Sequence, residues 1–305
     1  MNAGYVDLQV NGCAGVSFSA PDLTREGIER VGARLGQRGI AAYCPTLVTE
    51  SPAIYERNLP LLARACEAPA GPGVARILGI HLEGPFINPK DGPRGAHPLE
   101  HVQAPSINLF DRMRRWTEGH LAIVTLAPDV DGALPLIEHI VRSRAAVVSI
   151  GHHSADADTI RRACDAGARL ATHVGNGLED VIHRHHNPLW PMLAEDRLTG
   201  MFITDGHHLP ADFIRVALRA KGVERFIVTS DMTALSGLPP GEYAFHGQTI
   251  VAEANGRLHL KGEYRLAGSS SDLRACAEYF ASLGLLDDAG LRAVTRDNAL
   301  RALNP

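Results

Sequence analysis

The sequence predicts a (β/α)8 barrel, a closed ring of eight parallel strands surrounded by helices. Short apolar runs of strand-like composition alternate with segments that have helical periodicity and good helix formers. This alternation is typical of a parallel sheet covered on both faces, and eight repeats within 305 residues favour a closed barrel. Polar residues follow the runs, as expected where the carboxyl ends of barrel strands meet at one mouth.

The predicted strands are apolar runs bounded by polar or turn residues. In chain order they are Tyr5–Val10, Ala41–Cys44, Ile77–Leu82, Leu121–Leu126, Ala145–Ile150, Leu170–Thr172, Met201–Ile203 and Phe226–Thr229. Helices are predicted between them, over stretches such as Asp22–Arg38, Ala53–Glu67, Ala155–Gly167 and Asp212–Gly222. After the eighth run, alternating residues in 235–266 predict a β-hairpin excursion, and a helix is predicted over Asp272–Leu283. We expect residues 1–305 to form a single barrel domain.

Composition limits the classes of partner and compartment. The formal charge of -4 and the lack of a Lys/Arg cluster argue against nucleic acid and anionic membranes, so a small-molecule partner is expected. The five cysteines are scattered, without a Cys-x-x-Cys pair, which suits a reducing compartment. The sequence has no signal-peptide pattern at its start and no run long enough to span a bilayer. We therefore expect a cytoplasmic protein.

Four residues at the ends of predicted strands have the chemistry of a hydrolytic metal site. Glu83, His152 and His173 supply a carboxylate and two imidazoles, a set that leaves one metal position for water. Asp231 follows the eighth run, where a buried carboxylate needs a partner. Each residue has a structural alternative: a solvated loop acid, a core or capping histidine, or a helix N-cap. Because strand ends converge in a barrel, the four together favour a metal-dependent hydrolase.

Nine motifs cover nearly the whole chain: VDLQVNGCAG (6–15), HLEGPFIN (81–88), RGAH (94–97), TLAPD (125–129), IGHHSA (150–155), ATHVGNGL (171–178), ITDGHHL (203–209), VTSDMTA (228–234) and LAGSS (266–270). In sequence and in order they resemble the motifs of the N-acetylglucosamine-6-phosphate deacetylase family of the amidohydrolase superfamily. A set of this extent is far more specific than any single short motif. The resemblance implies a metal-dependent amide hydrolase of amino sugar metabolism, which removes the acetyl group from an N-acetyl amino sugar.

The resemblance also implies the roles of individual residues. Carried over by position, Glu83, His152 and His173 bind one divalent metal ion, with Zn²⁺ expected and Fe²⁺ as the alternative. Asp231 matches the family's catalytic aspartate, which takes a proton from the metal-activated water and passes it to the leaving amine. His97 matches a histidine that helps to polarise the acetyl carbonyl.

Further positions are assigned to substrate binding. His208 matches a histidine that contacts the sugar, and Asn176 and Gly177 lie in the motif that follows His173. Gln9 and Asn11 occupy positions at which many superfamily members carry a His-x-His pair for a second metal. Amides are poor zinc ligands beside imidazole, so we expect one metal and a substrate-binding role for both amides.

The phosphate site departs from the family pattern. The resemblance implies a homodimer in which an arginine from the neighbouring subunit binds the substrate phosphate. Arg184 falls at the matching position, but a different sequence, residues 185–187, follows it, and 183–186 can equally be a solvated loop. Glu179 and Asp180 add negative charge nearby, which raises the cost of binding phosphate. An unphosphorylated acetamido sugar therefore stays open beside the phosphorylated one.

Family members also carry a β-sandwich built from both ends of the chain. This sequence begins at the first predicted strand and ends after the last predicted helix, so we expect a barrel-only variant. Two other functions remain open: hydrolysis of a different or cyclic amide, and non-catalytic binding of a metabolite. Substrate profiling distinguishes hydrolysis of another amide from deacetylation of an amino sugar. Purified protein that contains no metal and hydrolyses no acetamido sugar would favour non-catalytic binding.

Overall fold

The computed structural model describes residues 4–245, 248–263 and 266–304. Within these ranges, eight parallel strands pair in the order β1-β4-β6-β7-β8-β9-β10-β11. Their bounds are β1 (Tyr5–Val10), β4 (Ile40–Leu47), β6 (Ile80–Glu83), β7 (Leu121–Leu126), β8 (Val147–Ile150), β9 (Leu170–Ala171), β10 (Thr199–Ile203) and β11 (Phe226–Thr229). This arrangement confirms the predicted (β/α)8 barrel.

The first and last barrel strands meet near their carboxyl ends. Val10 and Met232 form an isolated parallel bridge, and the backbone N–H of Asn11 donates to the carbonyl of Met232 at 2.8 Å. Deeper in the barrel, Oδ1 of Asp7 on β1 accepts a hydrogen bond from the Thr229 hydroxyl on β11 at 2.9 Å. We call this junction between β1 and β11 the seam of the barrel.

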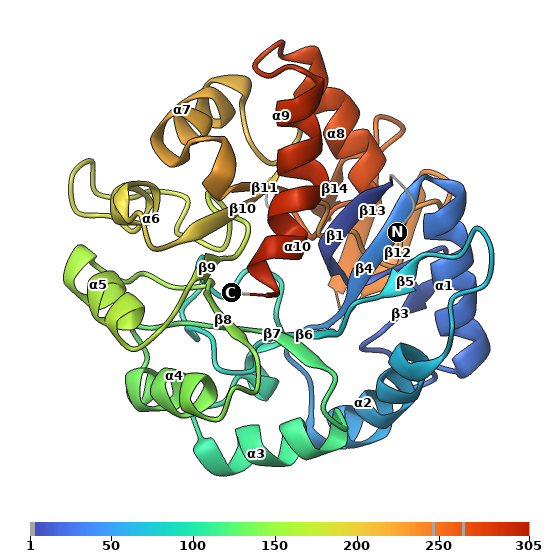
Figure 1. The fold of residues 1–305 in the computed structure, drawn as a ribbon, viewed down its shortest axis with the longest axis horizontal. Helices are drawn as coiled ribbons and strands as arrows, with labels where there is room; N and C mark the ends of the chain where they lie inside the picture. Colours follow the sequence, from blue (N-terminus) through green and yellow to red (C-terminus); the bar gives the residue numbers. More distant parts are fainter. Residues whose placement is uncertain (1–3, 246–247, 264–265, 305) are drawn as a thin grey trace.

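Helices cover the outside of the ring, as Figure 1 shows. They are α1 (Arg25–Gln37), α2 (Pro52–Glu67), α3 (Ile107–Trp116), α4 (Ala133–Arg142), α5 (Ala157–Asp165), α6 (Leu189–Ala194), α7 (Ala211–Lys221), α8 (Leu273–Ser282), α9 (Asp288–Arg292) and α10 (Asn298–Ala302), with a π-helical segment, Ala293–Asp297, before α10. Side chains cap several of them: Thr24 accepts from the N–H of Gly27, and Asp272 from that of Ala275. Their apolar faces pack on the outer side of the strands and form the main core.

A smaller apolar core fills the amino-terminal half of the barrel interior. It includes Val6, Leu8, Met201 and Ile227 from the strands and Ala299 from α10. Figure 1 shows α10 close to the barrel axis, where it covers this end of the ring. The strand ends opposite α10 are therefore the ones left to form a functional mouth.

One predicted strand is divided in the structure. The apolar run Ile77–Leu82 predicts a single strand, but in the structure β5 (Arg76–Ile77) and β6 are separate strands. Gly79 lies between them with φ +149°, and a Cβ there would lie 2.7 Å from the Cβ of Ala122. Only glycine fits this close approach, so the backbone bends where the apolar pattern suggested continuity.

The segment after β11 contains an antiparallel sheet of three strands, β12 (Gly241–Phe245), β13 (Gln248–Ala252) and β14 (Leu258–Leu260). Residues 246, 247, 264 and 265 of the predicted excursion lie outside the described residues. Ile250 and Leu260 form a satellite core with Ala267, and Ala96 packs against it. The excursion thus contacts the loop after β6. No helix among the described residues has the length and apolarity needed to cross a membrane.

Candidate active site

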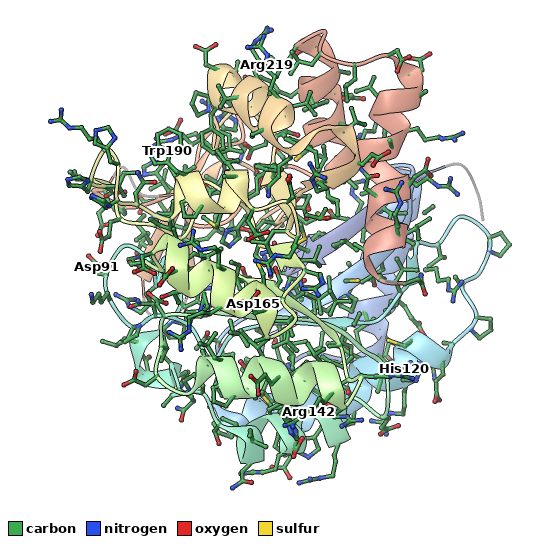
Figure 2. The ribbon with its side chains drawn as sticks, turned by 60° about the vertical axis from the view of Figure 1, so that its left-hand side comes forward. Asp91, His120, Arg142, Asp165, Trp190 and Arg219 are labelled. Atoms are coloured by element: carbon green, nitrogen blue, oxygen red, sulfur yellow. The ribbon has the colours of Figure 1, made fainter. Side chains whose placement is uncertain are left out.

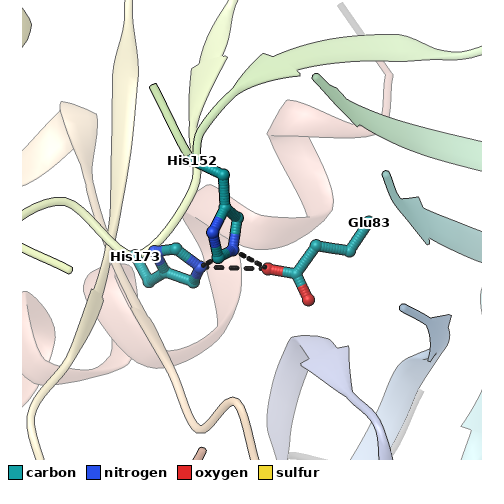
Figure 3. Close-up of side chains that lie close together, drawn as sticks. All are labelled: Glu83, His152 and His173. Atoms are coloured by element: carbon teal, nitrogen blue, oxygen red, sulfur yellow. Dashed lines mark hydrogen bonds and ion pairs between the residues drawn. The ribbon is translucent and has the colours of Figure 1, made fainter. Parts of the chain in front are cut away.

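Three side chains that could bind a metal ion converge at the mouth opposite α10. Glu83 is the last residue of β6, and His152 and His173 follow β8 and β9 by two residues. Oε1 of Glu83 lies 3.2 Å from Nε2 of His152 and 3.0 Å from Nε2 of His173, and the two Nε2 atoms are 3.0 Å apart. Figure 3 shows the three side chains meeting from separate strand ends. All three are buried.

This cluster fits a divalent metal ion by its donor atoms and their spacing. Nδ1 of His152 lies 2.8 Å from the carbonyl of Pro93 and must donate to it, so Nε2 presents a lone pair to the cluster. A carboxylate oxygen and a second imidazole nitrogen face the same point, so three atoms that can bind a cation converge there. Ligands of a tetrahedral zinc ion are separated by roughly 3.3 Å, close to the observed spacing. A cation at the centre would satisfy all three donors.

Charge within the cluster shifts the ionisation of its members. Burial acts to raise the pKa of Glu83, but the contacts and charge of the His152 and His173 rings outweigh it and hold that pKa well below its usual range. Burial acts to lower the pKa of His173, but the hydrogen bond and charge of Glu83 outweigh it and raise that pKa. The Glu83 carboxylate is therefore ionised and available as a ligand at neutral pH.

Asp231 lies beside the cluster and is held by two amides from β1 and the residue after it. Nε2 of Gln9 donates to Oδ1 of Asp231 at 2.9 Å and to Oε1 of Glu83 at 2.8 Å. Nδ2 of Asn11 donates to the same Asp231 oxygen at 2.7 Å. Burial, with the nearby charge of Glu83, raises the pKa of Asp231 to about 6. Gln9 and Asn11, predicted to bind substrate, thus contact the carboxylate on which proton transfer would depend.

The backbone is strained at three of these residues. His152, His173 and Asp231 have φ values of +54°, +29° and +51°, and they make up half of the six non-glycine residues with positive φ in the described part of the chain. Such conformations cost about 1–3 kcal/mol each and persist where the surrounding structure enforces them. The fold therefore holds these side chains toward the mouth against local backbone preference.

Gly177 fits closely against the rings of His152 and His173. Its φ is +61°, and an added Cβ would lie 3.0 Å from Nδ1 of His152 and 3.2 Å from Cε1 of His173. The absence of a side chain lets the loop after β9 cover the two imidazole rings. Gly177 therefore fixes the rings as well as lining the cavity.

His97 is oriented by Thr49, a contact that the sequence did not predict. The backbone N–H of Thr49 donates to Nδ1 of His97 at 3.3 Å, and the Thr49 hydroxyl lies 2.9 Å from the same nitrogen. Because Nδ1 accepts, the ring proton of a neutral His97 resides on Nε2. That nitrogen lies 3.2 Å from Nε2 of His152, so an N–H donor is directed into the site.

His208 is oriented in a similar way by Asp205, which sequence reasoning also missed. Nδ1 of His208 lies 2.8 Å from Oδ2 of Asp205, and the hydroxyl of Ser269 donates to that oxygen at 3.1 Å. Burial acts to raise the pKa of Asp205, but its contact with His208 outweighs this and lowers the pKa. A signal was present, because Asp205 follows β10 just as Asp231 follows β11.

A buried polar layer supports the site from below. Nδ1 of His81 lies 2.9 Å from the carbonyl of Leu8, and its Nε2 lies 2.8 Å from the hydroxyl of Thr125. Thr125 in turn lies 2.7 Å from the hydroxyl of Thr172. Burial lowers the pKa of His81 to about 4, so the ring is neutral and structural at physiological pH.

A cavity of about 500 Å³ opens over these residues. Its lining includes most of the predicted site residues: Asn11, Glu83, His97, His152, His173, Asn176, Gly177, His208 and Asp231. Glu179, Asp180 and His207 also line it, whereas Gln9 lies buried beneath and Arg184 is not among its lining residues. A larger cavity of about 1060 Å³, lined in part by Gly36, Arg76 and Thr295, lies at the opposite end of the barrel. Among the described residues, only the cluster at the mouth has three convergent metal-ligand atoms.

Known proteins are similar to this sequence over nearly its whole length. The N-acetylglucosamine-6-phosphate deacetylase of Danio rerio is 34% identical over 303 residues, covering 96% of this chain and 72% of the relative. The Bacillus subtilis enzyme of that name is 30% identical, covering 98% of this chain and 74% of the relative. The chain belongs to the N-acetylglucosamine-6-phosphate deacetylase family. It is thus an enzyme of a deacetylase family, whose members are hydrolases of amide C–N bonds.

Structural similarity supports the same family. An N-acetyl-D-glucosamine-6-phosphate deacetylase from Mycobacterium smegmatis, solved in complex with N-acetyl-D-glucosamine-6-phosphate, has a TM-score of 0.88 and 30% identity. The comparison covers 99% of this chain and 77% of that one. No model of a protein family matches the sequence. The expected membership of the deacetylase family is therefore confirmed by individual relatives.

Proposed function

We propose that this family member is a metal-dependent deacetylase acting on an N-acetyl amino sugar, either N-acetylglucosamine-6-phosphate or a related acetamido sugar. The convergence of Glu83, His152 and His173 beside Asp231 in one cavity carries the proposal. The names of the relatives support the substrate class, because they act on an N-acetyl amino sugar phosphate.

Glu83, His152 and His173 would hold one divalent ion, either Zn²⁺ or Fe²⁺, since both accept two imidazoles and a carboxylate. When bound, such an ion lowers the pKa of a water molecule toward neutrality and polarises a carbonyl group. Side chains of the protein would position the substrate and transfer the proton.

Asp231 is suited to transfer the proton. Gln9 and Asn11 fix its carboxylate at the cavity wall through hydrogen bonds of 2.9 and 2.7 Å to Oδ1. We assign it as the base that takes a proton from the attacking water and then as the acid that protonates the leaving nitrogen. The second step is needed because an amine anion is too basic to leave unaided.

His97 and His208 are assigned to the substrate. The Nε2–H of His97 would donate to the acetyl carbonyl oxygen, whose negative charge grows in the transition state. His208, Asn176 and Gly177 line the cavity and would contact the sugar. Arg184 does not line the cavity of its own chain, so its predicted contact with substrate requires a second copy of the protein.

Acetate release and metal content, measured on the same preparation, test this function. We expect metal-loaded protein to hydrolyse N-acetylglucosamine or its 6-phosphate, chelation to remove metal and activity together, and Zn²⁺ or Fe²⁺ to restore both. Glu83→Gln should lower metal affinity by at least tenfold. Glu138→Gln, at an exposed site on α4, is the matched control and should change neither the metal affinity nor the rate of acetate release. Full activity without metal would contradict the proposal.

We further propose that residues 1–305 act as one catalytic domain in a cytoplasmic homodimer. The five cysteines are all free, which is in keeping with a reducing compartment. The exposed side chains of Val181 and Trp190 offer apolar surface to a second copy. Light scattering coupled to size-exclusion chromatography tests the dimer, and a strictly monomeric active enzyme would contradict it.

A further inference from the structure

Asp129 joins the two loops on either side of its own strand. It follows β7, which pairs with β6 on one side and with β8 on the other. Its Oδ2 accepts from Nδ2 of Asn88, in the loop after β6, at 2.9 Å, and from the backbone N–H of Ser154, in the loop after β8, at 2.9 Å. One carboxylate oxygen therefore ties three consecutive loops of the mouth together.

The loops that Asp129 joins meet at His152. The backbone N–H of Asn88 donates to the carbonyl of His152 at 3.1 Å, and Nδ1 of the His152 ring donates to the carbonyl of Pro93 at 2.8 Å. Gly95 packs on the same ring, since a Cβ there would lie 3.4 Å from Cε1 of His152. The loop after β6 thus contacts both the backbone and the ring of His152.

His152 depends on such contacts because its backbone is strained. Its φ of +54° is one that neighbouring structure must enforce. The loop after β6 is itself long: the chain runs outward from Glu83 to Asp91, which Figure 2 shows at the edge of the molecule, and returns to the cavity at His97. Asp129 is the side chain that ties this loop to the segment that carries His152.

The contacts of Asp129 do not fit a local role. An aspartate after a strand often hydrogen-bonds within its own turn. Among the described residues, both hydrogen bonds of Asp129 go to neighbouring loops, and its buried Oδ1 has no hydrogen-bond partner. Hydrogen bonds to a carboxylate are roughly twice as strong as neutral ones, so this side chain is suited to hold the loops in place.

Resting on the proposed function, we infer that Asp129 is a positioning residue that holds His152, through Asn88 and Ser154, in the orientation that metal binding requires. Asp129 does not line the cavity, so it acts on the metal site only through these loops. Residues that orient a metal ligand typically contribute about 10–100-fold to metal affinity.

The test is a chelator-competition titration of Zn²⁺ on the full chain. We expect Asp129→Ala to lower the Zn²⁺ affinity by about 10–100-fold. Asp129→Asn keeps an oxygen that accepts from both N–H groups and should retain most of the affinity. Asn298→Ala is the matched control, because Asn298 also joins two carbonyls, of Val223 and Phe226, but at the opposite end of the barrel. It should leave the Zn²⁺ affinity unchanged.

A second measurement reports the geometry of the site without turnover. The visible absorption spectrum of bound Co²⁺ depends on how its ligands are arranged. At saturating Co²⁺, Asp129→Ala should change this spectrum, whereas Asn298→Ala should not. If Asp129→Ala does not fold, Asn88→Ala removes one of the two hydrogen bonds and should lower the Zn²⁺ affinity in the same direction.

Three outcomes overturn the inference. Unchanged Zn²⁺ affinity in folded Asp129→Ala, or in Asn88→Ala where the first variant does not fold, removes the positioning role. Equal losses of affinity in Asp129→Ala and Asn298→Ala would assign the effect to general stability. Wild-type protein that binds neither Zn²⁺ nor Co²⁺ contradicts the proposed function itself, and is distinguished from the other two outcomes before any variant is measured.

Discussion

Thr49 and His97 are joined by two contacts to one nitrogen: the Thr49 N–H at 3.3 Å and its hydroxyl at 2.9 Å both reach Nδ1 of His97. The backbone contact persists in any non-proline variant of Thr49. The tautomer that directs Nε2–H into the site is therefore set mainly by the main chain, and the hydroxyl contributes a smaller part.

This relationship predicts a graded effect on turnover. Thr49→Val should lower kcat by about tenfold or less, whereas His97→Gln should lower it by about 10²–10³, as for loss of a donor to a developing oxyanion. KM and metal content should change little in either variant. Steady-state kinetics on metal-loaded protein checks this, and near-normal turnover by His97→Gln would remove the carbonyl-polarising role.

Asp231→Asn should separate metal binding from catalysis. Asparagine keeps the shape and still accepts from Gln9 and Asn11, but it cannot take up the proton of the attacking water. We expect kcat to fall by about 10²–10⁴ while metal content stays near that of the wild type. Metal content and the rate of acetate release, measured on one sample, test whether the two effects are separate. Most of the activity surviving with metal in place would refute the assigned role.

Asp205 should affect substrate binding through His208. Asp205→Asn keeps the oxygen that accepts from the loop N–H groups of His207 and His208, but it removes the charge beside the His208 ring. We expect KM to rise several-fold, with a smaller change in kcat. Combining it with His208→Gln should add little to the single effects, because the two residues act together. Additive losses in the double-mutant cycle would show that they act separately.

Gly177→Ala should weaken metal binding. The added methyl group would press on both histidine rings, and disturbed ligand orientation costs about 10–100-fold in metal affinity. Gly119→Ala is the matched control, since Gly119 also has positive φ, +89°, but nothing lies within 4 Å of a Cβ there. Both substitutions should lower the free energy of unfolding by similar amounts, because both place a Cβ at positive φ. Only Gly177→Ala should lower the metal affinity. Competitive chelator titration measures the difference, and equal affinities would contradict the packing argument.

Asp7 should make stability depend on pH. Burial raises its pKa to about 6, above the value of 3.8 for an unperturbed Asp, so the folded state binds more protons between these values. Its contribution to stability is full below about pH 4 and is lost as pH rises through about 6. The free energy of unfolding of the wild type, minus that of Asp7→Asn, should therefore increase by on the order of 2–3 kcal/mol when the pH is lowered from 7.5 to 4. Denaturant titrations at both pH values check this, and a difference independent of pH would contradict it.

The strand-end residues were predictable because apolar runs mark where strands finish and parallel strands bring their ends to one mouth. The positions of Glu83, His152, His173 and Asp231 at strand ends therefore predict that they lie together. At Gly79 the apolar pattern predicts a continuous strand, whereas a close backbone approach divides it. A hydrophobic pattern carries no information on such a local φ value.

Contacts between loops were not predictable in the same way. Thr49 and His97 are 48 residues apart in loops without regular periodicity, so no spacing indicated their contact. Motif order gave Arg184 a position in the sequence, but its direction depends on hydrogen bonds within the turn around Asn187 and Trp190. Roles carried over by position thus need the three-dimensional course of each loop before they can be placed in the cavity.

The seam of the barrel has a consequence for how the enzyme loses activity. Gln9 and Asn11 belong to the start of the chain and Asp231 follows its last barrel strand, so hydrogen bonds that orient the proton-transfer group also cross the seam. Proteins open locally at lower free energy than they unfold globally. A brief parting of the first and last strands would misalign Asp231 while the helices and the rest of the ring stay folded. Thermal inactivation should therefore begin below the temperature at which helical structure is lost, and ligands that bridge the mouth should raise the onset of inactivation first.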